Sequence, residues 1–178
     1  MLTFTDHWID QARRVPSPNF NERPDPDDIA LVVIHNISLP PERFGGAHIE
    51  AFFQNRLDPD ADPYFQTIRD LKVSSHFLIR RDGELVQFVA CDRRAWHAGV
   101  SSWRGRDNCN DFALGIELEG ADHIPYEEAQ YRRLNALLDT LIAHYRGLSR
   151  DTITGHEHIA PGRKTDPGPA FDWSRLQS

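Results

Sequence analysis

Hydrophobic residues along this chain fall into short runs that predict buried strands. Ala30–Ile34 is an unbroken aliphatic and β-branched run, as expected of a central strand, and His35 emerges at its end. The runs 75–80 and 84–89 flank Asp82–Gly83, and an Asp-Gly pair between two β-rich runs is a strong hairpin signal. The pattern therefore predicts one buried central strand and one antiparallel pair.

The longest predicted element is a helix over Pro125–Arg146. Pro125 near its start, acidic residues in its first turn and Gly147 after its end are typical signals of helix termini. A shorter amphipathic helix is predicted over Gly46–Arg56, where three large apolar side chains share one face. The apolar stripe of the long helix consists of Leu134, Leu137, Leu138, Leu141, Ile142 and Tyr145.

The remaining segments complete the predicted architecture. Residues 112–118 and 152–154 are further strand candidates, the first 28 residues are expected to lie on the domain as an arm, and 155–173 to form an ordered, proline-rich loop. Strands and helices do not strictly alternate, and the hairpin breaks an all-parallel pattern. The sequence therefore predicts an α+β (mixed α/β) fold, with a central mixed sheet flanked by helices and a single domain over 1–178.

Composition excludes several classes of protein. The hydrophobic fraction of 39% and the charged fraction of 26% are ordinary for a globular chain. The net charge is −7 and no basic stripe occurs, so we expect no nucleic-acid partner. No apolar run approaches the roughly 20 residues that span a bilayer, and the first residues lack a secretion signal. We therefore expect no membrane partner, a cytoplasmic location, and reduced, buried or half-buried thiols at Cys91 and Cys109.

Candidate metal ligands occur in two places. His35 follows a buried strand, and His156 precedes Asp166 in the proline-rich loop. Two imidazoles and a carboxylate could hold zinc and leave a fourth position for water, as in catalytic zinc sites. From the residues alone, a structural histidine at position 35 and a polar loop held by its own hydrogen bonds remain open as alternatives.

A third candidate is the strand 113–119, which carries Glu117 and Glu119 between aliphatic residues. The alternation puts both carboxylates on one side of the strand, either aimed into a cleft as a general base or simply facing water. Trp96 and His97 follow the hairpin, where the indole could form the floor of a sugar or peptide site or belong to the core. No serine or cysteine nucleophile motif and no phosphate-binding glycine loop is present.

Long segments of the chain resemble a known enzyme family. They are VVIHNISLPPERFGG (32–46), SSHFLIRRDGELVQFV (74–89), residues 94–120 and TGHEHIAPGRKTDPGPAFDW (154–173), together with Arg13–Phe20. The chain is similar, nearly end to end, to the 1,6-anhydro-N-acetylmuramyl-L-alanine amidases of Gram-negative cytoplasm. These belong to the type 2 N-acetylmuramoyl-L-alanine amidase family, which is related to phage T7 lysozyme and peptidoglycan recognition proteins. The resemblance implies a mixed central sheet with zinc at one end.

The resemblance also implies roles for individual residues. His35 in VIHN, His156 in TGH and Asp166 in RKTDPGP would bind one Zn²⁺ ion. Glu117 in GIELEG would be the catalytic acid and base, and Lys164 in RKTD would stabilise the transition state.

Substrate contacts are expected from four residues. They are Asn36, Trp96, Arg106 and His97. Lys72 and Asn108 stand where relatives carry arginines for the stem peptide, so Arg106 could take over that contact. His158 stands near the ligand motif and could compete with His156 for the metal.

The expected function is zinc-dependent hydrolysis of the amide bond between the lactyl group of (1,6-anhydro)-N-acetylmuramic acid and L-alanine. A monomer would carry out this reaction on anhydromuropeptides during cytoplasmic recycling of the cell wall, with an influence on β-lactamase induction. The alternative is a non-catalytic muropeptide-binding sensor of the same fold. A complete ligand set with Glu117 and Lys164 favours the enzyme.

Overall fold

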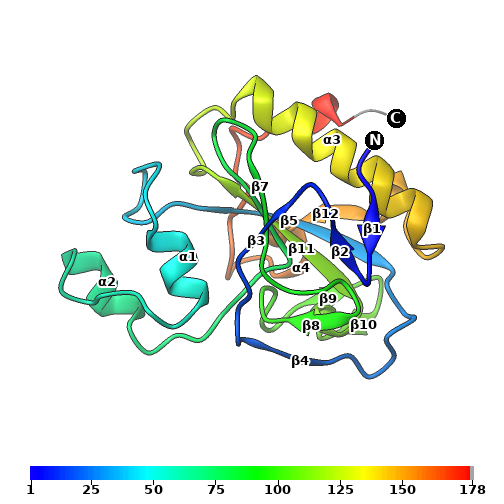
Figure 1. Ribbon diagram of the computed structural model, residues 1–178, viewed down its shortest axis with the longest axis horizontal. Coiled ribbons are helices and arrows are strands. Elements are labelled where there is room, and N and C mark those ends of the chain that lie inside the picture. Colours follow the sequence, from blue (N-terminus) through cyan, green and yellow to red (C-terminus); the bar gives the residue numbers. More distant parts are fainter. Residues whose placement is uncertain (177–178) are drawn as a thin grey trace.

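The computed structural model describes residues 1–176, and a six-stranded mixed sheet forms its centre (Figure 1). The strand order is β12-β5-β11-β6-β7-β3. The first four strands in this order run parallel, β7 is antiparallel to β6, and β3 is parallel to β7. The sheet strands are β3 (Arg13–Arg14), β5 (Leu31–Ile37), β6 (Phe77–Ile79), β7 (Leu85–Gln87), β11 (Ala113–Glu119) and β12 (Ile153–Gly155). The predicted α+β fold with a mixed sheet is confirmed.

Shorter elements surround this sheet. Three antiparallel pairs are β1 (Phe4–Thr5) with β2 (Trp8–Ile9), β4 (Phe20–Glu22) with β8 (Arg93–Ala95), and β9 (Ser102–Trp103) with β10 (Arg106–Asp107). The α-helices are α1 (His48–Phe53), α2 (Pro63–Ile68), α3 (Glu128–His144) and α4 (His156–Ile159). Short 3₁₀ turns occupy Cys109–Asp111, Arg150–Thr152 and Trp173–Arg175.

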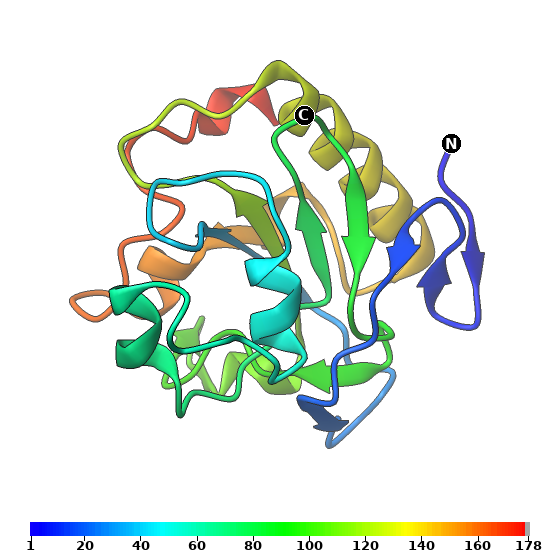
Figure 2. The same ribbon diagram turned by 60° about the vertical axis from the view of Figure 1, so that its left-hand side comes forward.

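The two faces of the sheet have different coverings. α3 lies across one face, and α1 lies on the opposite side, together with the long loop that leads into it (Figures 1 and 2). Ile34 and Ile116 pack with the buried leucines of α3, whereas Leu78 and Val86 pack with Phe52 and Phe53 of α1. Because strand side chains alternate, the second face also carries His35 and Glu117.

The long helix follows its predicted stripe. Leu134, Leu137, Leu138 and Leu141 are fully buried in one cluster, and Ile142 and Tyr145 pack against it while partly buried. The helix begins at Glu128, after a capping box in which Glu127 and Gln130 exchange hydrogen bonds with each other's backbone. The burial of these four leucine side chains is the main source of the helix's stability.

The structure differs from the prediction in several places. Helix α4 (His156–Ile159) lies within 155–173, which was predicted to be a loop. The central strand does not end at His35 but continues to Ile37, so His35 is held on both sides within β5. The first 28 residues are not only an arm, because β3 joins the sheet beside β7. Helix α2 was not predicted, although Asp62 accepts a hydrogen bond from the backbone of Tyr64 and Pro63 occupies the first turn, the usual signals of a helix start.

Two further predictions concern the state of the cysteines and the presence of membrane-spanning segments. Cys91 and Cys109 are both buried and free, as predicted. Within residues 1–176, no helix is both long enough and apolar enough to cross a membrane.

Candidate metal centre and active site

Strand register brings the predicted residues together at one end of the sheet. Glu117 of β11 pairs with His35 of β5, so their side chains point to the same face. β12 pairs with β5 through Thr154–Val33 and Gly155–Ile34, and the chain turns into α4 at His156, beside His35. The loop after α4 then returns Asp166, whose carbonyl accepts a hydrogen bond from the backbone of Glu157.

Three side chains converge there as a candidate metal site. Nδ1 of His35 lies 3.0 Å from Nδ1 of His156 and 3.1 Å from Oδ2 of Asp166. Nδ1 of His156 lies 3.2 Å from the same carboxylate oxygen. Tetrahedral zinc with bonds of about 2.1 Å separates its ligand atoms by about 3.4 Å, so these residues fit such an ion with small adjustments.

The protonation of His35 and Asp166 suits a metal. Burial lowers the pKa of His35, which favours the neutral imidazole that a metal requires. Burial opposes ionisation of Asp166, but the adjacent imidazoles of His156 and His35 outweigh that effect and lower the pKa of the carboxyl well below its usual value. Two neutral imidazoles and one carboxylate are a donor set typical of catalytic zinc.

A backbone carbonyl group and a third imidazole lie behind the two ligand imidazoles. Nε2 of His156 lies 2.9 Å from the carbonyl oxygen of Ala98, to which it donates, so its Nδ1 keeps a free lone pair. Nε2 of His35 lies 2.9 Å from Nδ1 of His97. Arg163 donates to the same Ala98 carbonyl at 2.7 Å.

Glu117 is a buried carboxyl group beside this cluster. Only 8% of its surface is exposed, and its Oε2 has no hydrogen-bond partner among the described residues. Burial raises the pKa of Glu117 well above the ordinary value, Asp166 raises it further, and Lys164 opposes both effects. The raised pKa makes the carboxylate a stronger base, and lets the carboxyl hold a proton more readily, than an exposed glutamate, which suits general acid–base chemistry.

A cavity of about 670 Å³ opens over these residues. Its polar lining includes His35, Glu117, His156, Asp166 and Lys164. Its lining also includes large apolar side chains, namely those of Phe52, Tyr64, Ile68, Leu71 and Trp96. Such a cavity can take a ligand with both polar and apolar parts.

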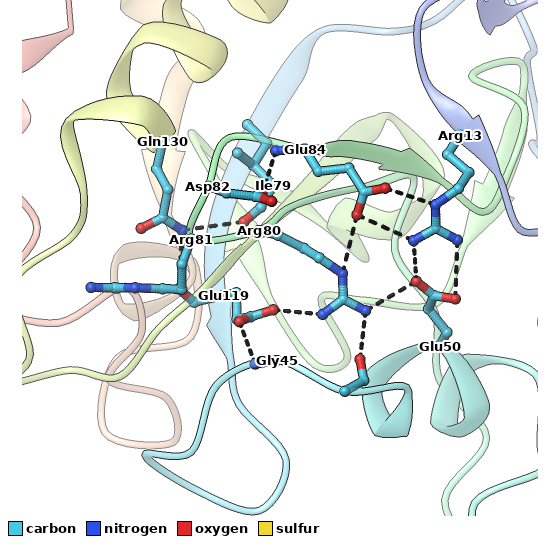
Figure 3. Close-up of polar contacts among 11 residues, drawn as sticks. Arg13, Gly45, Glu50, Ile79, Arg80, Arg81, Asp82, Glu84, Glu119 and Gln130 are labelled. Atoms are coloured by element: carbon cyan, nitrogen blue, oxygen red, sulfur yellow. Dashed lines mark hydrogen bonds and ion pairs between the residues drawn. The ribbon is translucent and has the colours of Figure 1, made fainter.

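One wall of the cavity is the loop before α1, which an ion-pair network holds (Figure 3). Glu119, the last residue of β11, accepts hydrogen bonds from the backbone of Gly45 at 2.8 Å and from Arg80 at 2.7 Å. Arg80 also donates to the carbonyl of Gly46 and to Glu50 of α1, both at 3.0 Å. Glu119 is thus a buried structural partner of this loop, rather than an acid facing water or the metal cluster.

Glu50 and Glu84 extend the network to the N-terminal segment. Arg13 of β3 lies 2.5 Å from Glu50 and 2.8 Å from Glu84 (Figure 3). Two arginines and three glutamates therefore tie β3, the β6–β7 hairpin, α1 and β11 to one another. No motif in the sequence indicates this network, because its five members come from four separate segments.

The predicted substrate contacts occupy different environments. Asn36, Trp96 and His97 line the cavity. The side-chain amide of Asn36 donates to Asp122 at 2.8 Å and to the carbonyl of Pro167 at 3.1 Å, and so also fixes the loop that carries Asp166. The indole nitrogen of Trp96 donates to Asn21 at 2.9 Å.

Arg106, the fourth predicted contact, lies outside the lining of this cavity. Its guanidinium is 2.5 Å from Asp28 and covers the ring of Phe112 at 3.8 Å. The predicted substrate contact from Arg106 therefore has no support in this geometry. Asn108 lines a separate cavity of about 470 Å³.

His158 points away from the metal ligands. Its Nδ1 accepts hydrogen bonds from the backbone of Gly155 and the hydroxyl of Thr154, both at 3.3 Å, and its ring lies 5.7 Å from that of Trp173. The cluster of converging ligand atoms in the described residues contains His156 instead.

Sequence reasoning missed the partners behind the ligands. The carbonyl of Ala98 and the guanidinium of Arg163 are absent from the predicted site, and His97 was assigned only to the substrate. No spacing rule could have identified a backbone carbonyl, and Arg163 differs from other arginines only by standing next to Lys164 in the ligand loop.

Comparisons with known proteins identify the family of this chain. The family model described as N-acetylmuramoyl-L-alanine amidase matches residues 25–169. The 1,6-anhydro-N-acetylmuramyl-L-alanine amidase AmpD of Salmonella typhimurium strain SL1344 is 58% identical over 171 residues, covering 96% of this chain and 91% of AmpD.

Two solved structures are also similar. A crystal structure of a selenomethionine AmpD derivative has a TM-score of 0.95 at 55% identity, covering 98% of this chain and 97% of that one. The amidase AmiD of Escherichia coli, in complex with its substrate anhydro-N-acetylmuramic acid-L-Ala-D-gamma-Glu-L-Lys, has a TM-score of 0.59 at 28% identity, covering 98% of this chain and 64% of AmiD. With the family model and the AmpD identity together, the chain belongs to the N-acetylmuramoyl-L-alanine amidase family.

Proposed function

We propose that this enzyme uses one zinc ion to hydrolyse the amide bond between the lactyl group of 1,6-anhydro-N-acetylmuramic acid and the L-alanine of a stem peptide. The observation that carries the proposal is the convergence of His35, His156 and Asp166 within hydrogen-bond distance of one another, beside the buried Glu117. The AmpD relatives and the substrate named for AmiD support the choice of an anhydromuropeptide.

The three ligands would hold the metal, and the remaining residues would move protons and charge. When bound, zinc would lower the pKa of water and polarise a carbonyl group. Glu117 would accept the proton of the attacking water on a carboxylate oxygen and deliver it to the departing amine of L-alanine. The ammonium of Lys164, on the lining of the same cavity, would stabilise the negative charge that develops on the carbonyl oxygen.

The substrate would lie in the cavity. Its sugar or peptide would contact the flat ring of Trp96 and the other apolar residues of the lining, which would exclude water from the reacting bond. Asn36 would hold the loop of Asp166 through its hydrogen bond to Pro167, and so keep this metal ligand in a fixed position relative to the substrate.

Metal analysis and an assay of peptide release test this proposal together. We expect one zinc per chain, loss of turnover of anhydromuropeptide on chelation, and recovery when zinc is restored. His156→Ala should lose zinc, whereas His158→Ala, which removes an imidazole from the same short helix, should keep it. Undiminished turnover by metal-free protein would refute zinc dependence.

The competing function is a muropeptide sensor that binds without cleaving. A pure binder would have no use for a buried acid with a raised pKa beside three metal ligands. The same assay separates the two, because a sensor would bind the anhydromuropeptide and leave it intact over many equivalents.

We further propose that the reaction serves recycling of cell-wall fragments in the cytoplasm, with an effect on β-lactamase induction through muropeptide levels. The AmpD resemblance and the unpaired, buried thiols of Cys91 and Cys109 support a reducing compartment. We also propose a single-domain monomer. Fractionation of cells, β-lactamase induction in a deletion strain and sedimentation of the purified chain are the corresponding tests.

A further inference from the structure

We propose that His97 is a positioning residue of the metal site, which accepts a hydrogen bond from His35 and thereby keeps the metal-binding nitrogen of His35 free of its proton. The inference rests on the proposed function, since it concerns the affinity of the same site for zinc. It is separate from the direct substrate contact that the sequence suggested for His97.

Proton counting fixes the direction of this hydrogen bond. One proton lies between Nε2 of His35 and Nδ1 of His97, which are 2.9 Å apart. If His97 donated it, a neutral His35 would carry its own proton on Nδ1, the atom that faces His156 and Asp166. A metal can bind at that Nδ1 only when His35 donates from Nε2 and His97 accepts.

The surroundings hold the His97 ring in place for this contact. The backbone N–H groups of His97 and Ala98 both donate to the side-chain oxygen of Asn110, at 3.1 and 2.8 Å. A Cβ atom at Gly115 would lie 2.6 Å from Cγ of His97, so only a glycine at this position of β11 allows the ring to lie there. Two features therefore hold the ring in place: the hydrogen bonds of its backbone segment to Asn110, and the space that Gly115 leaves for it.

The other ring nitrogen shows what the imidazole contributes. Nε2 of His97 is buried and has no hydrogen-bond partner within residues 1–176. An unpaired buried N–H is unfavourable, so an apolar side chain of similar size would pack here at lower cost. The feature that an imidazole adds at this position is the acceptor at Nδ1, toward His35.

Ala98, the residue after His97, accepts a hydrogen bond from the second ligand histidine, His156. The carbonyl of Ala98 accepts the proton of Nε2 of His156 at 2.9 Å, and Arg163 donates to that carbonyl at 2.7 Å. Arg163 also donates to the carbonyl of Val100 at 2.7 Å. Two consecutive residues, His97 and Ala98, thus orient both imidazole ligands, and Arg163 ties their segment to the loop that carries Asp166.

Zinc affinity of the full-length protein, measured by competition with a chromophoric chelator, tests the positioning role. His97→Leu keeps the size of the side chain and removes the acceptor, and we expect its zinc affinity to fall about 10- to 100-fold. His97→Asn places an amide oxygen where Nδ1 stood, and we expect it to restore most of that loss. His123→Ala is the matched control, since it removes an exposed imidazole from the same cavity lining and should leave affinity unchanged.

The outcomes separate this inference from the proposed function. A wild-type protein that binds no zinc would refute the proposed function itself. Zinc binding by His97→Leu as tight as in the wild type, or binding by His97→Asn as weak as in His97→Leu, would overturn only the positioning role.

A second measurement needs no variant, in case His97→Leu does not fold. In the zinc-loaded wild-type protein with ¹⁵N-labelled histidine, long-range proton–nitrogen correlations should place the proton of His97 on Nε2 and that of His35 also on Nε2. A proton found on Nδ1 of His97 would overturn the proposal.

Discussion

Arg80 donates to Glu119 across 2.7 Å at the end of β11, two residues beyond the buried acid Glu117. Side-chain exposure is only 12% for Arg80 and 2% for Glu119, so this ion pair is largely withdrawn from water. Because Arg80 and Glu119 also hold the backbone of Gly46 and Gly45, the strand that carries Glu117 and the loop that walls the cavity are tied to each other.

Removing the cation from this pair should destabilise the protein. Arg80→Met leaves Glu119 buried with only the N–H of Gly45, and we expect the free energy of unfolding to fall by about 3–5 kcal/mol in denaturant titrations. The double variant Arg80→Met/Glu119→Gln should recover part of this loss. Arg93→Ala, which removes an exposed pair with Glu22, is the control and should cost about 1 kcal/mol or less. Equal losses in Arg80→Met and Arg93→Ala would argue against a buried network.

Glu117→Gln should separate catalysis from metal binding. The amide has nearly the same shape and cannot accept the proton of water, so we expect turnover to fall about 10²- to 10⁴-fold with zinc content unchanged. Steady-state release of peptide and metal analysis of the same sample provide the measurement. Near-normal turnover, or loss of zinc from the variant, would contradict the role assigned to Glu117.

Local sequence patterns were sufficient to predict the elements whose signals come from a few neighbouring residues. The continuous run before His35, the Asp-Gly hairpin and the leucine stripe of α3 each follow from a few neighbouring residues. The short strands β1–β4 could not be predicted this way, since each has only two or three residues, too few for a periodic pattern. In addition, β3 and β4 form by pairing with β7 and β8, far along the chain.

The metal cluster shows the corresponding limit for the site. His35 lies 121 residues from His156 and 131 from Asp166, so spacing alone left a structural histidine and a polar loop as open alternatives. The family motifs selected the three residues. The parallel register of β12 and β5 explains why His156 lies beside His35, and the loop after α4 returns Asp166 to them. The acceptor role of His97 depends on a hydrogen bond between side chains, for which neither spacing nor motif carries a signal.

The two thiols should be inert in the folded protein. Burial raises the pKa of Cys91 to about 12 and that of Cys109 above its ordinary value, so neither forms an appreciable thiolate at pH 8. We expect no fast reaction with Ellman's reagent in the native state and two thiols per chain after unfolding in denaturant. A rapidly reacting native thiol, or fewer than two in denaturant, would contradict the buried and unpaired state.

His76 should make the folded protein sensitive to acid. Burial and the neighbouring Arg23 lower the pKa of His76 to about 3, and the hydrogen bond to the carbonyl of Arg93 only partly opposes this. In the unfolded chain the group titrates near its ordinary value of 6.5, so below that pH the unfolded state binds a proton that the folded state excludes. Stability from this group is thus present above pH 6.5 and is lost as the pH falls toward 3.

His76→Gln removes this titration while keeping an amide that can accept from the backbone of Gly115. Urea unfolding of both proteins in chelator, at pH 7 and pH 4.5, should show that the wild type loses about 2.5 kcal/mol more than the variant over this interval, at close to 1.4 kcal/mol per pH unit below 6.5. The comparison at each pH cancels the titration of the other histidines, which both proteins share. A pH dependence that is the same in both proteins would mean that His76 is protonated in the folded state, and that the burial beside Arg23 does not exclude its charge.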